Sequence, residues 1–312
     1  MTPTAELRRL FGDRLQEAVS LARLTSSRIG GTAEALIEVR DAGELRQAAV
    51  GLWGLRIPFR MLGGGSNILV SDAGVREVIV ANQAAGSRFD VNGLSAHAWA
   101  ESGASLGGLA RRAGDRGLSG LEWAATVPGT VGGAVVGNAG AHGGDVARSL
   151  MTAEILQPPD RVENWKVERL EYGYRSSWLK QHPGEAVVLS AVFGLELSSP
   201  EVTRARMEAN IAHRRQTQPP GASWGSMFKN PPGDFAGRLI EAAGLKGWRI
   251  GQVEVSPVHA NFFLNHGGAT AADVASLLIE VRRRVRESSG VELELEIELL
   301  GDWPTEVREA LA

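Results

Sequence analysis

Short apolar runs alternate with amphipathic stretches over the N-terminal part of the chain. Residues 35–39 have the apolar composition of a strand, and residues 42–52 have the spacing of an amphipathic helix. Residues 58–62 and 77–80 predict two further strands, and a Gly triplet at 63–65 directly follows the first of these two. This order predicts a β-α-β unit with a glycine-rich turn at a strand end.

The pattern changes twice further along the chain. Apolar runs at 95–99 and 186–195 predict strands of a second part with mixed α/β structure. A linker at 198–200 then precedes a predicted helix at 202–215. We therefore expect three parts, at residues 1–84, 85–197 and 198–312.

The third part has the clearest periodicities. Apolar residues recur at helical spacing through 270–287, where Thr270 and Asp273 predict a capping box, and 235–243 predicts a shorter helix. Residues 291–299 alternate strictly between apolar side chains and glutamates, which predicts a half-buried strand with a solvated acidic face. This last strand could pack within the third part. Alternatively, it could return to pack with the first part of the chain.

Glycine is in marked excess, with 39 among 312 residues, or about 12% where an average chain has about 7%. No third-residue period is present, so the excess is not collagen-like. A hydrophobic fraction of 43% and a net charge of −3 exclude a disordered composition. The glycines instead concentrate locally, with nine in the 28 residues from 117 to 144.

The remaining composition excludes several classes of site. The chain has no cysteine, which excludes disulfides, thiolate nucleophiles, zinc–thiolate sites and iron–sulfur clusters. The near-neutral charge argues against a nucleic-acid binder. The charged N-terminus lacks the apolar core of a signal peptide, and no apolar run is long enough to span a membrane. We expect a cytoplasmic protein that binds neither nucleic acid nor membrane.

The common nucleotide and hydrolase motifs are absent. Neither G-x-x-x-x-G-K-[ST] nor G-x-G-x-x-G nor G-x-S-x-G occurs, and the six histidines lack the spacing of metal ligands. We therefore predict no metal site, no P-loop, no dinucleotide fingerprint and no hydrolase elbow.

Two glycine-rich segments are candidates for binding an anion. Residues 63–67 (Gly-Gly-Gly-Ser-Asn) and 129–133 (Gly-Thr-Val-Gly-Gly) would each form a loop with backbone amides free to point at an oxyanion. Two such loops suit a pyrophosphate, which has two charged centres. Tight turns without a ligand explain the same glycines about equally well.

Three polar side chains are candidates for a catalytic role, but the residues around them do not assign one. Arg175 lies in a polar stretch typical of the surface, Ser226 lies in a small-residue turn with no base beside it, and Glu296 is one of four alternating glutamates. From the residues alone, structural or surface positions explain them better than a catalytic role does.

Several segments together resemble the UDP-N-acetylenolpyruvoylglucosamine reductase family, from about Ser27 to Gly301. The N-terminal blocks of this resemblance are residues 28–31, 62–72, 120–134 and 137–140. They imply an FAD-binding domain of the vanillyl-alcohol-oxidase type in two subdomains, followed by a smaller α+β substrate domain, and hence a mixed α/β and α+β fold class. The three parts above are assigned to these units in that order.

The C-terminal blocks are more specific to the family. They are residues 174–177, 225–231, 243–247 and 259–265, in the family's order and spacing. The compact segment between residues 145 and 175 is similar to the short subtype, which lacks an inserted substrate-covering element.

The resemblance implies roles for individual residues. Arg175 matches the family's catalytic arginine, Ser226 its proton donor and Glu296 its catalytic glutamate, with Glu294 as the alternative register. The implied substrate contacts are Tyr174, Lys229 and Asn230. The implied FAD contacts are Gly63, Gly64, Gly65, Ser66, Asn67, Pro128, Gly129, Thr130, Gly132, Gly133, Asn138 and Gly140.

The implied reaction is a reduction in peptidoglycan precursor synthesis. NADPH reduces FAD, and hydride passes from flavin N5 to UDP-N-acetylglucosamine enolpyruvate, giving UDP-N-acetylmuramate after Ser226 supplies a proton. No obligate protein partner is implied. Two rival hypotheses are an FAD oxidase of the same cofactor fold and a non-enzymatic flavin-binding relative; the joint presence of the three catalytic positions counts against both.

The chain departs from the family's pattern at two positions. Trp224 stands before Gly225 where a small residue is expected, and we expect it to narrow the mouth of the site. His142 replaces the usual tyrosine close to the implied FAD region. Neither departure removes a catalytic position.

Overall fold

The predicted β-α-β unit builds the first sheet. In the computed structural model, which describes residues 4–312, its strand order is β1-β2-β5-β3, and β5 pairs in parallel with both β2 and β3. The strands are β1 (Leu15–Ser20), β2 (Thr32–Val39), β3 (Phe59–Leu62) and β5 (Val78–Asn82). Beside them lie α1 (Thr4–Phe11), α2 (Ala42–Gly54) and 3-10 helices at Gly12–Arg14 and Leu21–Leu24. The strands and the helix predicted in this region are confirmed.

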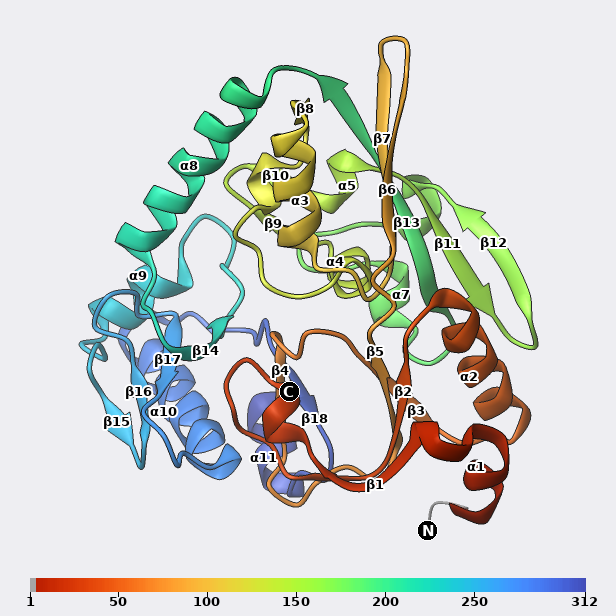
Figure 1. Cartoon of the computed structure of the whole chain (residues 1–312). Helices are drawn as coiled ribbons and strands as arrows, with labels where there is room; N and C mark the ends of the chain where they lie inside the picture. The colour runs from red at the N-terminus through yellow and green to blue at the C-terminus, as the bar shows by residue number, and fades with distance from the viewer. Residues whose placement is uncertain (1–3) are drawn as a thin grey trace.

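A second, antiparallel sheet contains the two strands predicted near 95 and 186. Its order is β12-β11-β13-β7-β6, with β8 paired to β13, and the β6–β7 hairpin projects beyond the rest of the molecule (Figure 1). The strands are β6 (Ser87–Asn92), β7 (Ser95–Glu101), β8 (Leu118–Ser119), β11 (Leu150–Gln157), β12 (Arg161–Trp165) and β13 (Val187–Leu197).

Short helices cover one side of this second sheet (Figure 1). They are α3 (Leu106–Asp115), the 3-10 helix Glu122–Ala124, α4 (Val131–Gly137), α5 (Val146–Ser149), α6 (Val167–Leu170) and α7 (Trp178–Gln181), with a small hairpin of β9 (Gly140–Ala141) and β10 (Gly144–Asp145). The core between helices and sheet is largely alanine, leucine and valine, which allows close approach of the layers.

Helix α8 (Pro200–Thr217) begins the third part and runs along one edge of the molecule toward the remaining elements of that part (Figure 1). There a sheet of order β14-β17-β16-β15 packs with three helices around an apolar core. The elements are β14 (Ala222–Ser226), α9 (Ala236–Ala242), β15 (Arg249–Ile250), β16 (Val253–Val255), β17 (Phe262–Asn265), α10 (Ala271–Ser289) and α11 (Thr305–Leu311). The predicted helices and the capping box of Thr270 and Asp273 are confirmed.

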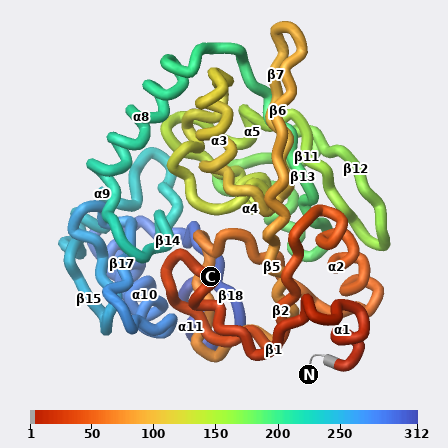
Figure 2. The backbone as a smooth tube through the Cα atoms, viewed as in Figure 1, coloured from red at the N-terminus to blue at the C-terminus, as the bar shows by residue number. Residues whose placement is uncertain are grey.

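The C-terminal end of the chain lies beside its N-terminal part (Figure 2). Strand β18 (Glu298–Leu300) pairs in parallel with β4 (Ile68–Val70), which follows the first glycine loop. The carboxylate of Asp72 accepts hydrogen bonds from the first two amides of α10, of Ala271 and Ala272, at 2.9 Å each. The third part is thereby joined to the first at two points.

The prediction of a continuous strand at 291–299 is wrong for most of its length. The ladder contains only Glu298–Leu300, and before it Leu295 forms a single bridge with Phe228 while residues 296 and 297 are bends. This segment bonds to the turn after β14, because the Lys229 amide donates to Glu294 O and the Glu296 amide donates to Met227 O. The alternation of side chains did not predict these bends or the irregular partners.

Two boundary predictions also need correction. The linker predicted at 198–200 is the start of α8, because Ser199 caps the helix and Pro200 is its first residue. The loop predicted at 129–133 ends at Thr130, which caps α4, so that Gly132 and Gly133 lie in a helix.

Each part of the described chain contributes to an apolar cluster, and some clusters join parts, since Leu156 and Leu189 pack with the first part and Leu69 packs with the third. The exact boundaries at 84/85 and 197/198 stay a prediction. Between residues 4 and 312, none of the helices combines the length and apolarity that crossing a bilayer requires.

Candidate active site

The two glycine loops lie directly against each other. A Cβ atom added to Gly63 would stand 2.4 Å from Thr130 Oγ1, and one added to Gly64 would stand 3.0 Å from Gly129 Cα. Gly129 itself has a φ of +98°, a conformation that favours glycine. The glycines are therefore required by close approach of two backbones as well as by turn geometry.

Backbone amides of both loops are left without protein acceptors. Within residues 4–312, no hydrogen bond to protein is donated by the amides of Gly64, Gly65, Ser66, Gly129 and Thr130. The buried hydroxyl of Thr126, just before the second loop, also has no partner in the described chain. Unpaired amides at a glycine cradle fit a phosphate-bearing group, so these residues suit the pyrophosphate of a dinucleotide such as FAD.

Not every residue predicted to contact the cofactor has a backbone amide free to bind a phosphate group. The Gly132 amide donates to Ser102 O at 2.7 Å, and a Cβ there would meet Ser102 Cβ at 2.8 Å. Gly132 therefore serves helix packing in this structure. Gly133 and Pro128 are exposed beside the cradle, while Ser66 Oγ would lie 2.9 Å from a Cβ on Gly129.

Asn138 positions the segment that contains Arg175. It ends α4 with a left-handed φ of 44°, and its side chain donates to Gly173 O at 2.9 Å and accepts from the Ala147 amide at 3.0 Å. The Asn138 side chain thus binds protein, although it was predicted to contact the cofactor. Sequence reasoning missed this role because the partners are far along the chain.

Arg175 lies at the tip of a tight turn. Gly173 and Ser176 exchange backbone hydrogen bonds, and Arg175 between them has a φ of 55°, which is unusual for a residue with a side chain. Tyr172 and Ser177 on either side donate their hydroxyls to the carbonyls of Val135 and Val136. The turn is therefore fastened to α4 on both flanks.

Arg175 and Glu296 form a partly buried ion pair between distant segments. Arg175 Nε donates to Glu296 Oε1 at 2.5 Å, and Arg175 Nη2 donates to Gly140 O at 3.1 Å. The Glu296 side chain is 14% exposed, whereas that of Glu294 is 74% exposed. The expectation that all four glutamates form a solvated face is therefore wrong at Glu296.

Burial raises the pKa of Glu296, and the positive charge of Arg175 acts in the opposite direction. Lys180 and Lys229 also lower this pKa, by smaller amounts. The carboxyl group is therefore harder to ionise than an exposed glutamate despite three nearby cations.

The backbone of Glu296 is fixed from two sides. Its amide donates to Met227 O at 2.9 Å, and its carbonyl accepts from Asn67 Nδ2 at 3.1 Å. Asn67 belongs to the first glycine loop and Met227 follows Ser226. The predicted cofactor loop and the residue that follows the predicted proton donor are thus both hydrogen-bonded to the backbone of Glu296.

Ser226 ends β14 at a turn that the third part holds rigidly. The Met227 amide donates to Asn261 O, and the buried Asn261 side chain bonds both the amide and the carbonyl of Phe228, at 2.9 and 2.8 Å. Asn261 lies in a block that the resemblance identified, but its clamping role was not predicted.

The predicted substrate contacts lie on the exposed side of this turn. Lys229 Nζ lies 3.1 Å from Glu294 Oε2, and the Asn230 amide is 3.5 Å from the Tyr174 hydroxyl. Tyr174 is exposed, whereas the Asn230 side chain accepts from the Ala236 amide at 3.0 Å. The turns of Arg175 and Ser226 therefore meet at their polar rims.

The expectation that Trp224 narrows the site is wrong. Its side chain is 2% exposed and packs in the apolar core of the third part. Alternation along β14 explains this placement, because it turns the side chain toward the core. His142 makes an edge-to-face contact with His213, their ring centroids 5.7 Å apart, and burial lowers its pKa.

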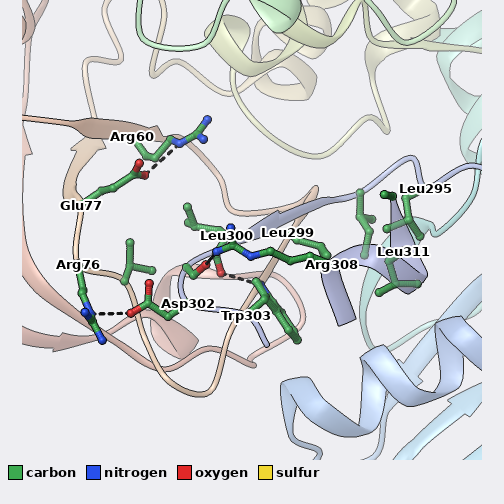
Figure 3. Close-up of a pocket in the computed structure, with 14 residues that line it drawn as sticks. Arg60, Arg76, Glu77, Leu295, Leu299, Leu300, Asp302, Trp303, Arg308 and Leu311 are labelled. Atoms are coloured by element: carbon green, nitrogen blue, oxygen red, sulfur yellow. Dashed lines mark hydrogen bonds and ion pairs between the residues drawn. The ribbon is translucent and has the colours of Figure 1, made fainter. Parts of the chain in front are cut away.

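A cavity of about 500 Å³ opens on the other face of the segment that carries Glu296 (Figure 3). Leu295, Ile297 and Leu299 line it, alternating with the glutamates that face the candidate site. Ion pairs such as Arg76 with Asp302 border this cavity. It is therefore behind the candidate active site and separate from it.

Two family models match the chain. The model described as "UDP-N-acetylenolpyruvoylglucosamine reductase, C-terminal domain" matches residues 216–300. The model described as "FAD binding domain" matches residues 33–160. The prediction of an FAD-binding part followed by a smaller C-terminal domain is confirmed, as is FAD as the cofactor.

Similar proteins share nearly the whole chain. The UDP-N-acetylenolpyruvoylglucosamine reductase of Rubrobacter xylanophilus is 47% identical over 90% of this chain and 94% of its own. That of Chloroflexus aurantiacus is 45% identical over 90% and 95%. The crystal structure of the Thermus caldophilus reductase has a TM-score of 0.78 and 37% identity, covering 92% of this chain and 99% of its own. The predicted resemblance is confirmed.

The contact between the glycine loops predicts the effect of Gly64→Ala on cofactor binding. The added methyl would press on Gly129 and separate the loops, so we expect weaker FAD binding, by about tenfold or more. Gly54→Ala is the matched control, because nothing lies within 4 Å of a Cβ at Gly54. Fluorescence titration of apoprotein with FAD measures both; equal affinities would contradict the proposed cradle.

The raised pKa of Glu296 predicts how stability depends on pH. Folding favours the protonated carboxyl, so the unfolded state loses its proton first as pH rises above the ordinary glutamate value of about 4.3. The wild-type free energy of unfolding should therefore fall relative to that of Glu296→Gln as pH rises through this range. Urea titrations of both holoproteins measure the two free energies; a wild-type value that rises relative to that of Glu296→Gln as pH rises would contradict the assignment.

Proposed function

Because the chain belongs to the UDP-N-acetylenolpyruvoylglucosamine reductase family, we propose that it reduces UDP-N-acetylglucosamine enolpyruvate to UDP-N-acetylmuramate with NADPH as reductant. Bound FAD supplies hydride transfer between NADPH and the enolpyruvyl group. The free amides of Gly64, Gly65, Ser66, Gly129 and Thr130 would hold its pyrophosphate. The observation that supports this function best is the Arg175–Glu296 pair beside the Ser226 turn.

Arg175 binds the carboxylate of the enolpyruvyl group. A guanidinium has five N–H donors, and in this structure Nε bonds Glu296 while Nη2 bonds Gly140 O. The remaining donors suit a bidentate contact with a planar carboxylate. When hydride reaches the terminal carbon, negative charge develops on the carbon beside the carboxylate, and Arg175 stabilises it as an enolate-like form.

Glu296 sets the orientation of Arg175. Its carboxylate accepts from Nε, so the opposite edge of the guanidinium is directed away from the pair. Because Asn67 and Met227 fix the Glu296 backbone, this orientation exists before the substrate binds. Pre-organisation of the charged donor lowers the reorganisation needed in the transition state.

Ser226 donates the proton that completes the reduction. A serine hydroxyl is a weak acid in water, but the carbon bearing the developing charge is a strong base, which makes the transfer favourable. The clamp from Asn261 on the following residues holds the turn against displacement. Tyr174, Lys229 and Asn230 at the rim bind the sugar nucleotide, with Lys229 contacting a phosphate.

One anaerobic experiment tests this proposal. NADPH should bleach the yellow colour of the bound flavin, and UDP-N-acetylglucosamine enolpyruvate should then restore it without oxygen. Failure of the colour to return would contradict the proposed substrate. Return of the colour only on admission of oxygen would favour the alternative of an FAD oxidase.

Replacing Ser226 should separate the two half-reactions. In Ser226→Ala, NADPH should still bleach the flavin at the wild-type rate, while reoxidation by the enolpyruvyl substrate slows by about a hundredfold or more, because the proton donor is missing. Stopped-flow absorbance measures both rates. Ser223→Ala, on the same strand, is the control. Loss of both half-reactions in Ser226→Ala would instead indicate a structural role.

A further inference from the structure

Two cations of one segment meet two carboxylates of another beside the candidate site. Arg175 and Lys180 belong to the turn and to α7 directly after it, and Glu296 and Glu298 belong to the C-terminal segment that ends in β18. Lys180 Nζ lies 3.4 Å from Glu298 Oε1. This second pair joins the same two segments as the Arg175–Glu296 pair. The function described above uses only the first of these pairs.

We propose that Lys180 is a positioning residue, which holds the Glu296 segment in register against Arg175 through its ion pair with Glu298. This inference rests on the proposed function, because Glu296 acts by orienting Arg175. No contact between Lys180 and substrate is required.

Lys180 stands on a rigid support. Ser177 Oγ accepts a hydrogen bond from the Lys180 amide at 3.1 Å and donates one to Val136 O at 2.6 Å. Ser177 is completely buried, and the Lys180 side chain is 21% exposed. The lysine is therefore fastened to α4, the same helix that supports the Arg175 turn.

Glu298 is the first residue of β18, and the regular pairing with β4 begins there. Its amide donates to Asn67 O, and it pairs with Ile68 of β4. Glu296, two residues earlier, lies outside any ladder and depends on single hydrogen bonds to Asn67 and Met227. A second tie between α7 and β18 therefore limits sliding of the Glu296 carboxylate relative to Arg175.

An exposed ion pair usually contributes little to stability, so the contribution of the Lys180–Glu298 pair depends on its burial and geometry. Here the Lys180 side chain is mostly covered, while the Glu298 side chain is 49% exposed. Both ends start from backbones that other hydrogen bonds already fix. The backbones at both ends therefore need no further ordering, and partial burial limits the rotamers of the Lys180 side chain, which favours a measurable contribution.

Positioning and simple electrostatics have different signatures. The charges that face Glu296 are Arg175, Lys180 and Lys229, with Glu294 and Glu298 on its own segment. Because Lys180 lowers the pKa of Glu296, Lys180→Met should raise that pKa. Glu298→Gln removes the ion pair but no cation, so it should not raise the pKa of Glu296.

The test compares Lys180→Met, Glu298→Gln and the double variant as FAD-loaded enzymes. We expect each single change to slow flavin reoxidation by the enolpyruvyl substrate by about tenfold, with the rate of bleaching by NADPH unchanged. The double variant should be no slower than either single one, because one interaction is lost in all three. The acid limb of the reoxidation rate should move to higher pH only where Lys180 is replaced.

Matched controls keep the result interpretable. Lys166→Met removes a solvent-exposed lysine just before α6 and should behave as wild type. Lys180→Arg should restore most of the rate if the ion pair is responsible. Reoxidation of Lys180→Met at the Lys166→Met rate, or additive losses in the double variant, would overturn the proposal. If wild type itself is not reoxidised by the substrate, the proposed function fails instead.

Discussion

The ion pair of Arg175 with Glu296 is the interaction on which the geometry of the candidate site depends. The two residues are 121 positions apart and come from the second and third parts of the chain, while the first part contributes Asn67 to the same place. Separate hydrogen bonds hold each residue in place. Asn138 and α4 hold the Arg175 turn, and Asn67 and Met227 hold the backbone of Glu296. Three separately packed parts are thus required to align one guanidinium.

A second constraint is the backbone contact between the glycine loops. Close approach of Gly64 to Gly129 leaves no room for side chains, and the amides that would bond within a sheet stay without protein acceptors. Where such amides are buried, they cost stability unless water or a ligand satisfies them. The excess of glycine therefore follows from building an anion-binding surface out of main chain, and Asn67 connects that surface directly to Glu296.

The sequence predicts local structure well where periodicity is long, as in α10 and its capping box. It predicts the glycine loops as phosphate-binding candidates, although tight turns without a ligand explain the same glycines about equally well. It could not predict the burial of Glu296, since the strictly alternating glutamates look equivalent and only a distant arginine distinguishes one of them. The same reason applies to Trp224 and to the anchoring residues Asn138 and Asn261, whose partners are remote in sequence.

The central claim is that Arg175 and Glu296 act as one unit. A double-mutant cycle with Arg175→Lys and Glu296→Gln, measured as the anaerobic rate of flavin reoxidation by UDP-N-acetylglucosamine enolpyruvate, tests it most directly. Each single variant should be strongly slowed, and the double variant should be about as slow as the worse single one. Losses that multiply independently in the double variant would contradict the account.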